Sequence, residues 1–437
     1  MTQLNQLIRA ILVSVLPATA FLITSCDVKH ASEDAFLTAP QKVDSVIDSF
    51  VDNGSYPFVY ARLEDKNGNV LYEHGNVNAD LLPGVEVDGD TWIRIWSMSK
   101  IVTISTALDL VEEGLLGLDD PVSEYIPEFS DLKVAVSPDG TPLTELGEGE
   151  SACPIKLIPM DSVMTVRHLL DHKAGFYYST TGISCVDSMM AAKDFPAAFD
   201  SDDLIHRMAA LPLIQQPGTN YFYGTNTTVL GLVMERATGK DLQQIVRERV
   251  LEPAGIEGLQ YDLPKGETLI PCVSGRDTVL RLAHPGDLDI FSPSVPDYDP
   301  DHALYLGGEG MIATSDGYTD FLRLLLNRGT LNGARILDPA TVKDIHSPHT
   351  LLDNPYGYNG YNLWVSSDSM RVQGTGDGGL WIGGGYEGTH FWIDPHREFV
   401  GVIMTQIFWV PSAGYGRDDA IRGEIYRQLY EAGRNDI

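Results

Sequence analysis

Residues 94–114 of the 437-residue chain read Arg94-Ile95-Trp96-Ser97-Met98-Ser99-Lys100 and continue through an apolar stretch to Gly114. Apolar side chains recur in this stretch at helical spacing, at Ile101, Ile104, Leu108 and Val111. The spacing predicts a helix that opens at Ser97 and ends before Gly114. Residues three apart share one face of a helix, so we expect the Ser97 hydroxyl and the Lys100 amine to meet.

Ser97 and Lys100 form a candidate nucleophile and base. A serine at a helix start lies at the positive end of the helix dipole, which favours a developing alkoxide. Lys100 can accept the serine proton only if burial or a second cation keeps it neutral part of the time. The alternative interpretation of this short pattern is a helix cap followed by a solvated lysine.

The rest of the chain predicts strands at both ends and helices between them. Two hairpins are expected, over residues 58–63 with 69–72 and over residues 388–393 with 399–404. Helical patterns follow at residues 166–170, 203–211, 227–237 and 242–251, and a last helix at 418–432. We therefore expect an α/β (α+β) fold: one mostly antiparallel sheet built from N- and C-terminal segments, flanked by helices, with a helical insertion over about 120–300.

Motifs in this order resemble the serine β-lactamase and penicillin-binding-protein superfamily, in particular its class C branch. They span about residues 90 to 430 and comprise Arg94 to Lys100, Leu110 to Val122, Thr165 to Gly175, Pro217 to Tyr223, Gly307 to Thr314, Leu331 to Leu337 and Phe391 to Pro395. The resemblance implies the β-lactamase/DD-peptidase fold and acyl-enzyme chemistry at Ser97, with no metal or cofactor.

The resemblance also implies a catalytic tyrosine. Tyr223 stands where the family has the tyrosine of its Tyr-x-Asn motif. Thr225 stands in place of the asparagine and is an expected substrate-binding residue. Tyr223 is expected to hydrogen-bond Ser97 and Lys100 and to carry a proton to the leaving group. Tyr221 is the less favoured candidate for this role.

The family's third motif, Lys-Thr-Gly in β-lactamases, corresponds to within a residue or two to Gly383-Gly384-Gly385, followed by Tyr386. The segment has no lysine, and it is closer to the version in the esterases that resemble class C β-lactamases. Gly384 and Gly385 permit close backbone approach, and the N–H groups of Ser97 and Tyr386 are the expected oxyanion hole.

The N-terminal segment predicts export. Residues 1–26 contain one charged residue, Arg9, then an apolar run that ends at Cys26 in a pattern resembling a bacterial lipobox. We expect a signal peptide over 1–26, a lipid on Cys26, a tether over 27–39, and a hydrolase domain over 40–437 in the bacterial cell envelope, facing the periplasm. An ordinary signal peptide with a stray cysteine is the alternative.

Three further cysteines remain for an oxidising compartment, Cys153, Cys185 and Cys272. Cys153–Cys185 is the first choice for a disulfide, with Cys272 free, and the other pairings stay open. The sequence contains neither Cys-x-x-Cys nor His-Glu-x-x-His, so a zinc site has no support.

Charge and motifs together define the expected function. Lys and Arg number 30 against 61 Asp and Glu, and the net charge of −31 disfavours a nucleic-acid partner. We expect a secreted serine hydrolase, held at the membrane by its lipid, that acts as a carboxylesterase on small esters. The alternatives are a β-lactamase, a D-amino-acid peptidase or amidase, and a catalytically silent binding lipoprotein; the oligomeric state is open.

Overall fold

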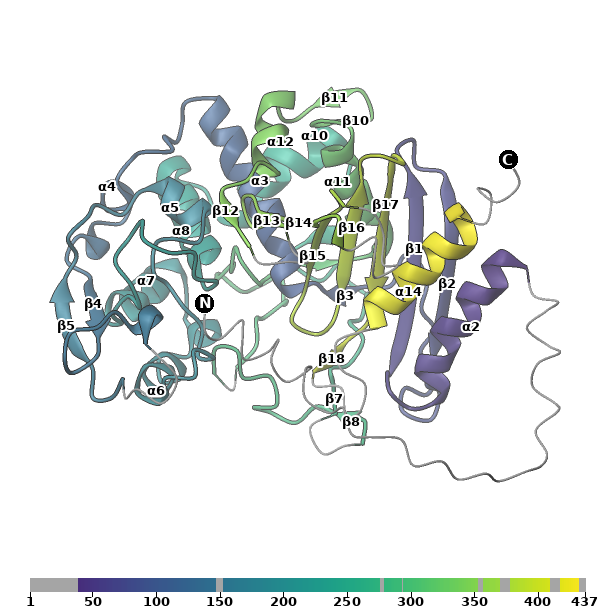
Figure 1. Ribbon diagram of the computed structural model, residues 1–437, viewed down its shortest axis with the longest axis horizontal. Helices are drawn as coiled ribbons and strands as arrows, with labels where there is room; N and C mark the ends of the chain where they lie inside the picture. Colours follow the sequence, from purple (N-terminus) through teal and green to yellow (C-terminus); the bar gives the residue numbers. More distant parts are fainter. Residues whose placement is uncertain are drawn as a thin grey trace.

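An eight-stranded antiparallel sheet joins the two ends of the chain (Figure 1). The structure is a computed structural model that describes residues 38–146, 152–275, 279–292, 294–352, 357–369, 378–408 and 417–431. The strand order is β12-β13-β14-β15-β16-β17-β1-β2. The central β1 (Phe58–Asp65) pairs with β2 (Val70–Val77) on one side and β17 (Phe399–Met404) on the other. The expected fold class and the two expected hairpins are therefore confirmed.

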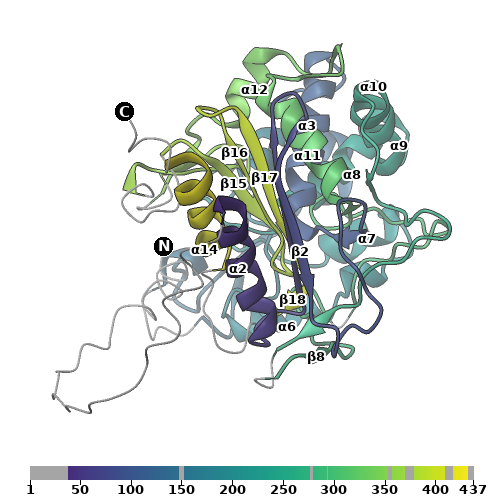
Figure 2. The same cartoon turned by 90° about the vertical axis from the view of Figure 1, so that its right-hand side faces the viewer.

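Helices cover both faces of this sheet (Figure 2). One face carries α2 (Ala39–Asp52) and α14 (Arg417–Ile425), which continues as a π-helical turn over Tyr426–Glu431. The other face carries α3 (Ser99–Glu112), α8 (Asn226–Thr238) and α11 (Ser315–Leu326). Strand β1 is buried on both sides because Phe58 and Tyr60 face one core while Val59, Ala61 and Leu63 face the other.

The remaining strands are short. They are β3 (Ile93–Arg94), β4 (Lys133–Val136), β5 (Lys156–Pro159), β6 (Leu259–Gln260), β7 (Val273–Ser274), β8 (Arg281–Leu282), β9 (Ile312–Ala313), β10 (Thr330–Leu331), β11 (Ala334–Arg335), β12 (Thr350–Leu351), β13 (Tyr358–Asn359), β14 (Trp364–Val365), β15 (Trp381–Gly384), β16 (His390–Asp394) and β18 (Ile407–Phe408). Strand β9 pairs with both β3 and β6, and this pairing places the segment before Ser97 beside the glycine-rich segment 307–310.

The first helices of the expected insertion lie to one side of the sheet, at the left of Figure 1, and its last helix lies at the top of the view. Its helices are α4 (Val122–Tyr125), α5 (Val166–Leu170), α6 (Ser184–Ala191), α7 (Ser201–Ala209), α8, α9 (Leu242–Val246) with a π-helical turn over Arg247–Leu251, and α10 (Glu252–Ala254). Helix α12 (Pro339–Ile345) follows later in the chain. The helices predicted at 166–170, 203–211, 227–237 and 242–251 correspond to α5, α7, α8 and α9 with its extension.

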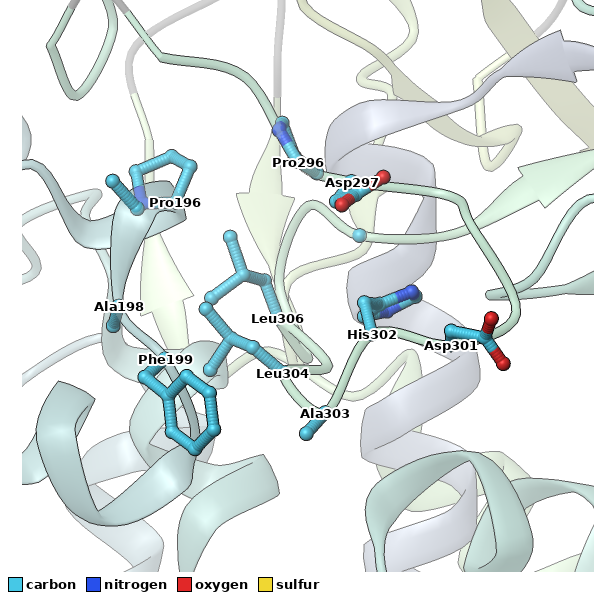
Figure 3. A pocket seen from close by; sticks show the side chains of 12 residues that line it. Pro196, Ala198, Phe199, Pro296, Asp297, Asp301, His302, Ala303, Leu304 and Leu306 are labelled. Atoms are coloured by element: carbon cyan, nitrogen blue, oxygen red, sulfur yellow. The ribbon is translucent and has the colours of Figure 1, made fainter.

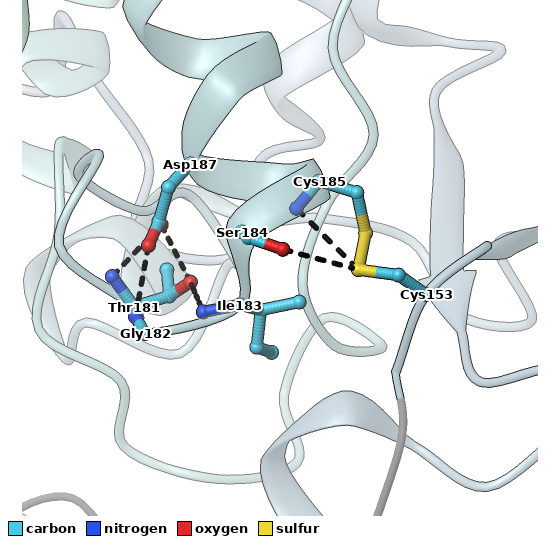
Figure 4. Close-up of a disulfide and its surroundings, with 7 residues drawn as sticks. All are labelled: Cys153, Thr181, Gly182, Ile183, Ser184, Cys185 and Asp187. Carbon is cyan, nitrogen blue, oxygen red and sulfur yellow. Dashed lines mark hydrogen bonds between the residues drawn. A yellow bond between two sulfur atoms is a disulfide. The ribbon is translucent and has the colours of Figure 1, made fainter.

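A disulfide joins Cys153 to Cys185 inside the insertion (Figure 4). It connects the segment before β5 to the first turn of α6. Cys272 remains a free thiol. The pairing that was the first choice from the sequence is confirmed.

Two helix boundaries differ from the sequence expectation. The helix expected to open at Ser97 begins at Ser99, because Trp96 adopts a left-handed φ of 45° and residues Trp96–Met98 form a 3-10 turn. Helix α2 begins at Ala39, the last residue of the expected tether. Its buried Val43, Ile47 and Val51 recur at helical spacing.

The signal peptide, Cys26 and most of the tether lie outside the described residues, which begin at Thr38. Among the helices that are described, none has both the length and the apolar character that crossing a membrane requires.

Candidate active site

Ser97 and Lys100 meet at the junction of the 3-10 turn and α3. The Lys100 ammonium donates a hydrogen bond to the Ser97 hydroxyl, with 3.1 Å between Nζ and Oγ. Ser97 is partly exposed, whereas Trp96, Met98 and Lys100 are buried. The serine therefore faces solvent while its partner is enclosed, which is the arrangement that an activated nucleophile needs.

Three further oxygen atoms surround the Lys100 ammonium. Nζ lies 2.7 Å from the Gly308 carbonyl oxygen, 2.9 Å from the Tyr178 hydroxyl and 3.1 Å from Oε1 of Glu309. Tyr178 donates a short hydrogen bond to the same Glu309 oxygen. Sequence reasoning missed both residues, although Tyr178 lies three residues beyond the motif that ends at Gly175 and Glu309 lies inside the motif Gly307 to Thr314.

The predicted tyrosine, Tyr223, contacts the same ammonium through its ring. Nζ of Lys100 lies 5.2 Å from the centroid of the Tyr223 ring, a cation–π contact. The ring also stacks on His172, with 5.1 Å between centroids. The structure thus brings Tyr223 to the site, but the tyrosine whose hydroxyl hydrogen-bonds Lys100 is Tyr178.

The residues around Tyr223 are buried and hold its segment in place. His172 accepts a hydrogen bond from the Asn226 side chain at 3.3 Å, and burial lowers its pKa well below the ordinary value, so it is neutral. Tyr221 lies 5.9 Å from the His172 ring, between centroids. Thr225, predicted to contact substrate, is 1% exposed and donates to the Tyr177 carbonyl oxygen. The Thr225 hydroxyl is therefore buried and bonded to the protein backbone.

The predicted oxyanion hole depends on the contact between the end of β15 and the turn that carries Ser97. At Gly385, a Cβ atom would lie 2.5 Å from the Ile95 carbonyl oxygen, so only glycine permits this approach. The Tyr386 and Trp96 rings pack edge to face at 5.3 Å between centroids. The backbone segments that carry the two expected donors, the N–H groups of Ser97 and Tyr386, therefore lie beside each other.

The third motif leaves no room for a lysine at its first position. Gly383 pairs with Phe391 of the neighbouring strand. A Cβ atom at Gly383 would lie 2.5 Å from the Phe391 ring, so a side chain there requires the ring to move. Gly384 faces the other side of the strand, near the Thr389 carbonyl oxygen.

Glu387 holds Trp96, the residue before Ser97, in place. Its carboxylate is fully buried and accepts hydrogen bonds from Arg94 Nε at 2.8 Å, from Trp96 Nε1 at 2.6 Å, and from the Cys272 thiol. Burial and the nearby Glu387 charge raise the pKa of Cys272, so the thiol keeps the proton that it donates. These bonds hold Trp96 in its left-handed conformation and thereby set the direction in which Ser97 leaves the turn.

A cavity of about 360 Å³ is lined in part by residues at the two ends of the glycine-rich segment (Figure 3). Phe199, Leu304 and Leu306 supply apolar walls, and Asp301 and His302 lie at its rim. It reaches the segment that carries Glu309 through Leu306 and Gly310. Ser97, Lys100 and the two tyrosines are not among its lining residues.

Replacing Glu387 with alanine tests how much its contacts with Arg94 and Trp96 stabilise the fold. The variant leaves Arg94 as a buried unpaired cation and removes the acceptor of Trp96, and breaking a buried pair costs about 3–5 kcal/mol. The matched control is Glu398→Ala, which breaks an exposed pair with Lys66 and is expected to cost less than about 1 kcal/mol. Urea denaturation of both variants measures their free energies of unfolding. Equal values for the two variants would contradict the stabilising role of Glu387.

Comparison with known proteins agrees with this geometry. The sequence model of the Beta-lactamase family matches residues 43–422. Protein Rv1367c of Mycobacterium tuberculosis is 31% identical over 344 residues, covering 75% of this chain and 80% of its own. Esterase EstB of Burkholderia gladioli is 28% identical over 273 residues, covering 60% and 62%.

A solved structure shares the fold across nearly the whole chain. EstCE1, described as a hydrolase with promiscuous acyltransferase activity, superposes with a TM-score of 0.71 at 21% identity, covering 89% of this chain and 98% of its own. The family match and the shared fold confirm the resemblance that the sequence motifs indicated. The chain belongs to the Beta-lactamase family, whose members are serine hydrolases and acyltransferases.

Proposed function

We propose that this protein is a serine hydrolase that acts on small carboxylic esters through an acyl-enzyme. The observation that carries the proposal is the 3.1 Å contact between Lys100 Nζ and the Oγ atom of the partly exposed Ser97. Ser97 attacks the ester carbonyl, and the N–H groups of Ser97 and Tyr386 hold the oxyanion. The serine proton passes through Lys100 and the side chains in contact with it to the leaving alcohol. Water then releases the acid.

The charge balance of the site favours a neutral substrate. Lys100 is paired with Glu309, and Arg94 is paired with Glu387, so neither cation is free to bind a substrate carboxylate. Gly383 provides no lysine where β-lactamases have one, and Phe391 occupies the space in which its side chain would begin. The similarity to an esterase, EstB, supports the same choice. A β-lactamase and a D-amino-acid amidase remain the alternatives that the substrate tests separate.

The first test is of the nucleophile. Ser97→Ala is expected to abolish ester hydrolysis and labelling by a fluorophosphonate probe, while Ser99→Ala keeps both. The Ser99 hydroxyl instead accepts a hydrogen bond from the Met311 N–H, so its loss costs about 1–3 kcal/mol of stability and leaves the chemistry in place. Hydrolysis by the Ser97→Ala protein at the wild-type rate would overturn the assignment. An unlabelled, inactive wild type would instead support a catalytically silent binding protein.

The second test is of substrate class. A β-lactam carboxylate that finds no charged partner loses about 1.5–3 kcal/mol, roughly ten- to over a hundredfold in binding. We therefore expect kcat/KM for p-nitrophenyl butyrate to exceed kcat/KM for nitrocefin by at least about tenfold. Parallel steady-state assays, with a D-alanyl amide as third substrate, measure the order. Faster turnover of nitrocefin or of the amide would replace the esterase assignment.

Export and lipid anchoring are part of the proposal and rest on the sequence alone. The segment up to Cys26 has the charge and apolar run of a signal peptide, and a lipid on Cys26 would hold the acidic hydrolase domain at a membrane. Cys26→Ser is expected to move the protein from the membrane fraction to the soluble fraction after expression in bacteria. A wild-type N-terminal peptide without lipid by mass spectrometry would contradict the anchor.

A further inference from the structure

The turn between β15 and β16 carries two residues that both contact Trp96. The Gly388 N–H donates to the Gly385 carbonyl oxygen at 3.0 Å, which closes a β-turn. Tyr386 and Glu387 are the two central residues of this turn. The Tyr386 ring packs edge to face on the Trp96 ring, and the Glu387 carboxylate accepts from the Trp96 indole N–H at 2.6 Å. Trp96 is therefore held by both central residues of the turn.

These contacts join the two expected donors of the oxyanion hole. One donor is the N–H of Ser97, which directly follows Trp96, and the other is the N–H of Tyr386, which directly precedes Glu387. Because Ser97 lies at the start of a 3-10 turn, its N–H has no partner within that turn and can face a substrate oxygen. The bond from the Trp96 side chain to the Glu387 side chain thus ties together the two backbone segments that carry the donors.

Trp96 keeps a backbone conformation that a bulky residue adopts only when its surroundings enforce it. Its φ of 45° lies in the left-handed region, which is unfavourable for a residue with a large side chain. The side chain is buried, and its indole N–H donates to Glu387. Without that bond, the backbone at Trp96 can relax toward a right-handed conformation, and this rotation would turn the Ser97 N–H away from Tyr386.

A carboxylate suits the group of donors that converges on Glu387. Arg94 donates from Nε at 2.8 Å and from Nη2 at 3.3 Å, Trp96 donates from Nε1, and Cys272 donates from its thiol. A carboxylate only accepts hydrogen bonds and offers two oxygen atoms, whereas an amide replaces one of them with a donor. The Arg94 backbone N–H also donates to the Gln406 side chain at 2.8 Å. The segment before Ser97 is therefore fixed at Arg94 and at Trp96.

We propose that Glu387 is the positioning residue of the oxyanion hole and that, through Trp96, it holds the N–H groups of Ser97 and Tyr386 where the oxyanion forms. The carboxylate is fully buried, so it acts through Trp96 rather than on the substrate. The inference rests on the proposed function, in which these two N–H groups hold the oxyanion. Loss of one such donor lowers kcat by about 10²- to 10³-fold, and a displacement of about 1 Å costs about 10²-fold.

Two variants break the link from opposite ends. Glu387→Ala removes the acceptor, while Trp96→Phe removes the indole donor and keeps an aromatic ring against Tyr386. The hole acts on charge that develops in the transition state, so we expect kcat on p-nitrophenyl butyrate to fall about 10- to 10²-fold with KM changed by less than about threefold. Glu387→Gln keeps an oxygen acceptor for the indole, and its kcat is expected to fall less than that of Glu387→Ala.

A boronic acid measures the hole without the departure of a leaving group. Butylboronic acid forms a bond between boron and Ser97 Oγ, and the serine proton is released to solvent. The anionic tetrahedral adduct keeps both boron hydroxyls, one of them at the oxyanion position. We expect the Ki of butylboronic acid to rise in Glu387→Ala and in Trp96→Phe by the factor by which kcat falls, to within about threefold. A purely structural role would not make these two factors agree.

Glu64→Ala is the matched control. Glu64 is also a buried carboxylate bonded to arginines, with 2.7 Å to Arg62 Nε and 3.0 Å to Arg323 Nε, but it lies on β1. Its loss is expected to destabilise the fold and to leave kcat and the boronic acid Ki within about threefold of the wild-type values. A rise in Ki as large as that of Glu387→Ala would assign the effect to general loosening of the fold and overturn the proposal.

The remaining outcomes separate this inference from the proposed function. A folded Glu387→Ala protein with wild-type kcat and Ki would overturn the role of Glu387, and so would a fall in kcat with an unchanged Ki. Circular dichroism reports whether each variant folds, and if Glu387→Ala does not fold, Trp96→Phe decides. Failure of the proposed function looks different, because the wild type itself would then neither hydrolyse esters nor react with the fluorophosphonate probe.

Discussion

The ion pair between Lys100 and Glu309 is completely buried, and the packing around Ser97 is arranged to tolerate it. Removing two charges from water costs several kcal/mol for each ion unless hydrogen bonds satisfy both of them. The Gly308 carbonyl and the Thr228 hydroxyl supply such bonds. They can do so because the glycine-rich segment approaches α3 and α8 closely: a Cβ atom at Gly308 would lie 3.2 Å from Lys100 Nζ.

A second buried glutamate lies on the opposite side of Ser97. Glu387 neutralises Arg94 and anchors Trp96, just as Glu309 neutralises Lys100 and bonds Tyr178. Lys100 and Arg94, two cations that the described part of the chain places near Ser97, therefore have their counter-charge built into the protein. Among the described residues, neither of these cations is left unpaired for a substrate anion, and this is the physical reason for which we propose neutral esters as substrates.

The site is assembled where the sheet meets the helical insertion. Strand β15 brings the Tyr386 backbone from the sheet, α3 brings Lys100, and the insertion brings Tyr178 and Tyr223. The disulfide lies within the insertion and joins the segment before β5 to α6, the helix that follows Tyr178 in the chain. Sheet and insertion thus contribute different groups, since the sheet side carries the expected oxyanion donor and the insertion carries the two tyrosines beside Lys100.

The sequence by itself determined the features that depend on short stretches of chain. Helical spacing predicted that Ser97 and Lys100 meet, and alternation around turn residues predicted the hairpins of β1 with β2 and of β16 with β17. Motif order, through the resemblance, indicated the family. Tertiary structure alone decided which tyrosine hydroxyl reaches Lys100, that Glu309 pairs with it, and that Trp96 is left-handed. The contacts responsible join residues 78, 209 and 291 positions apart, and no local periodicity records contacts over such separations.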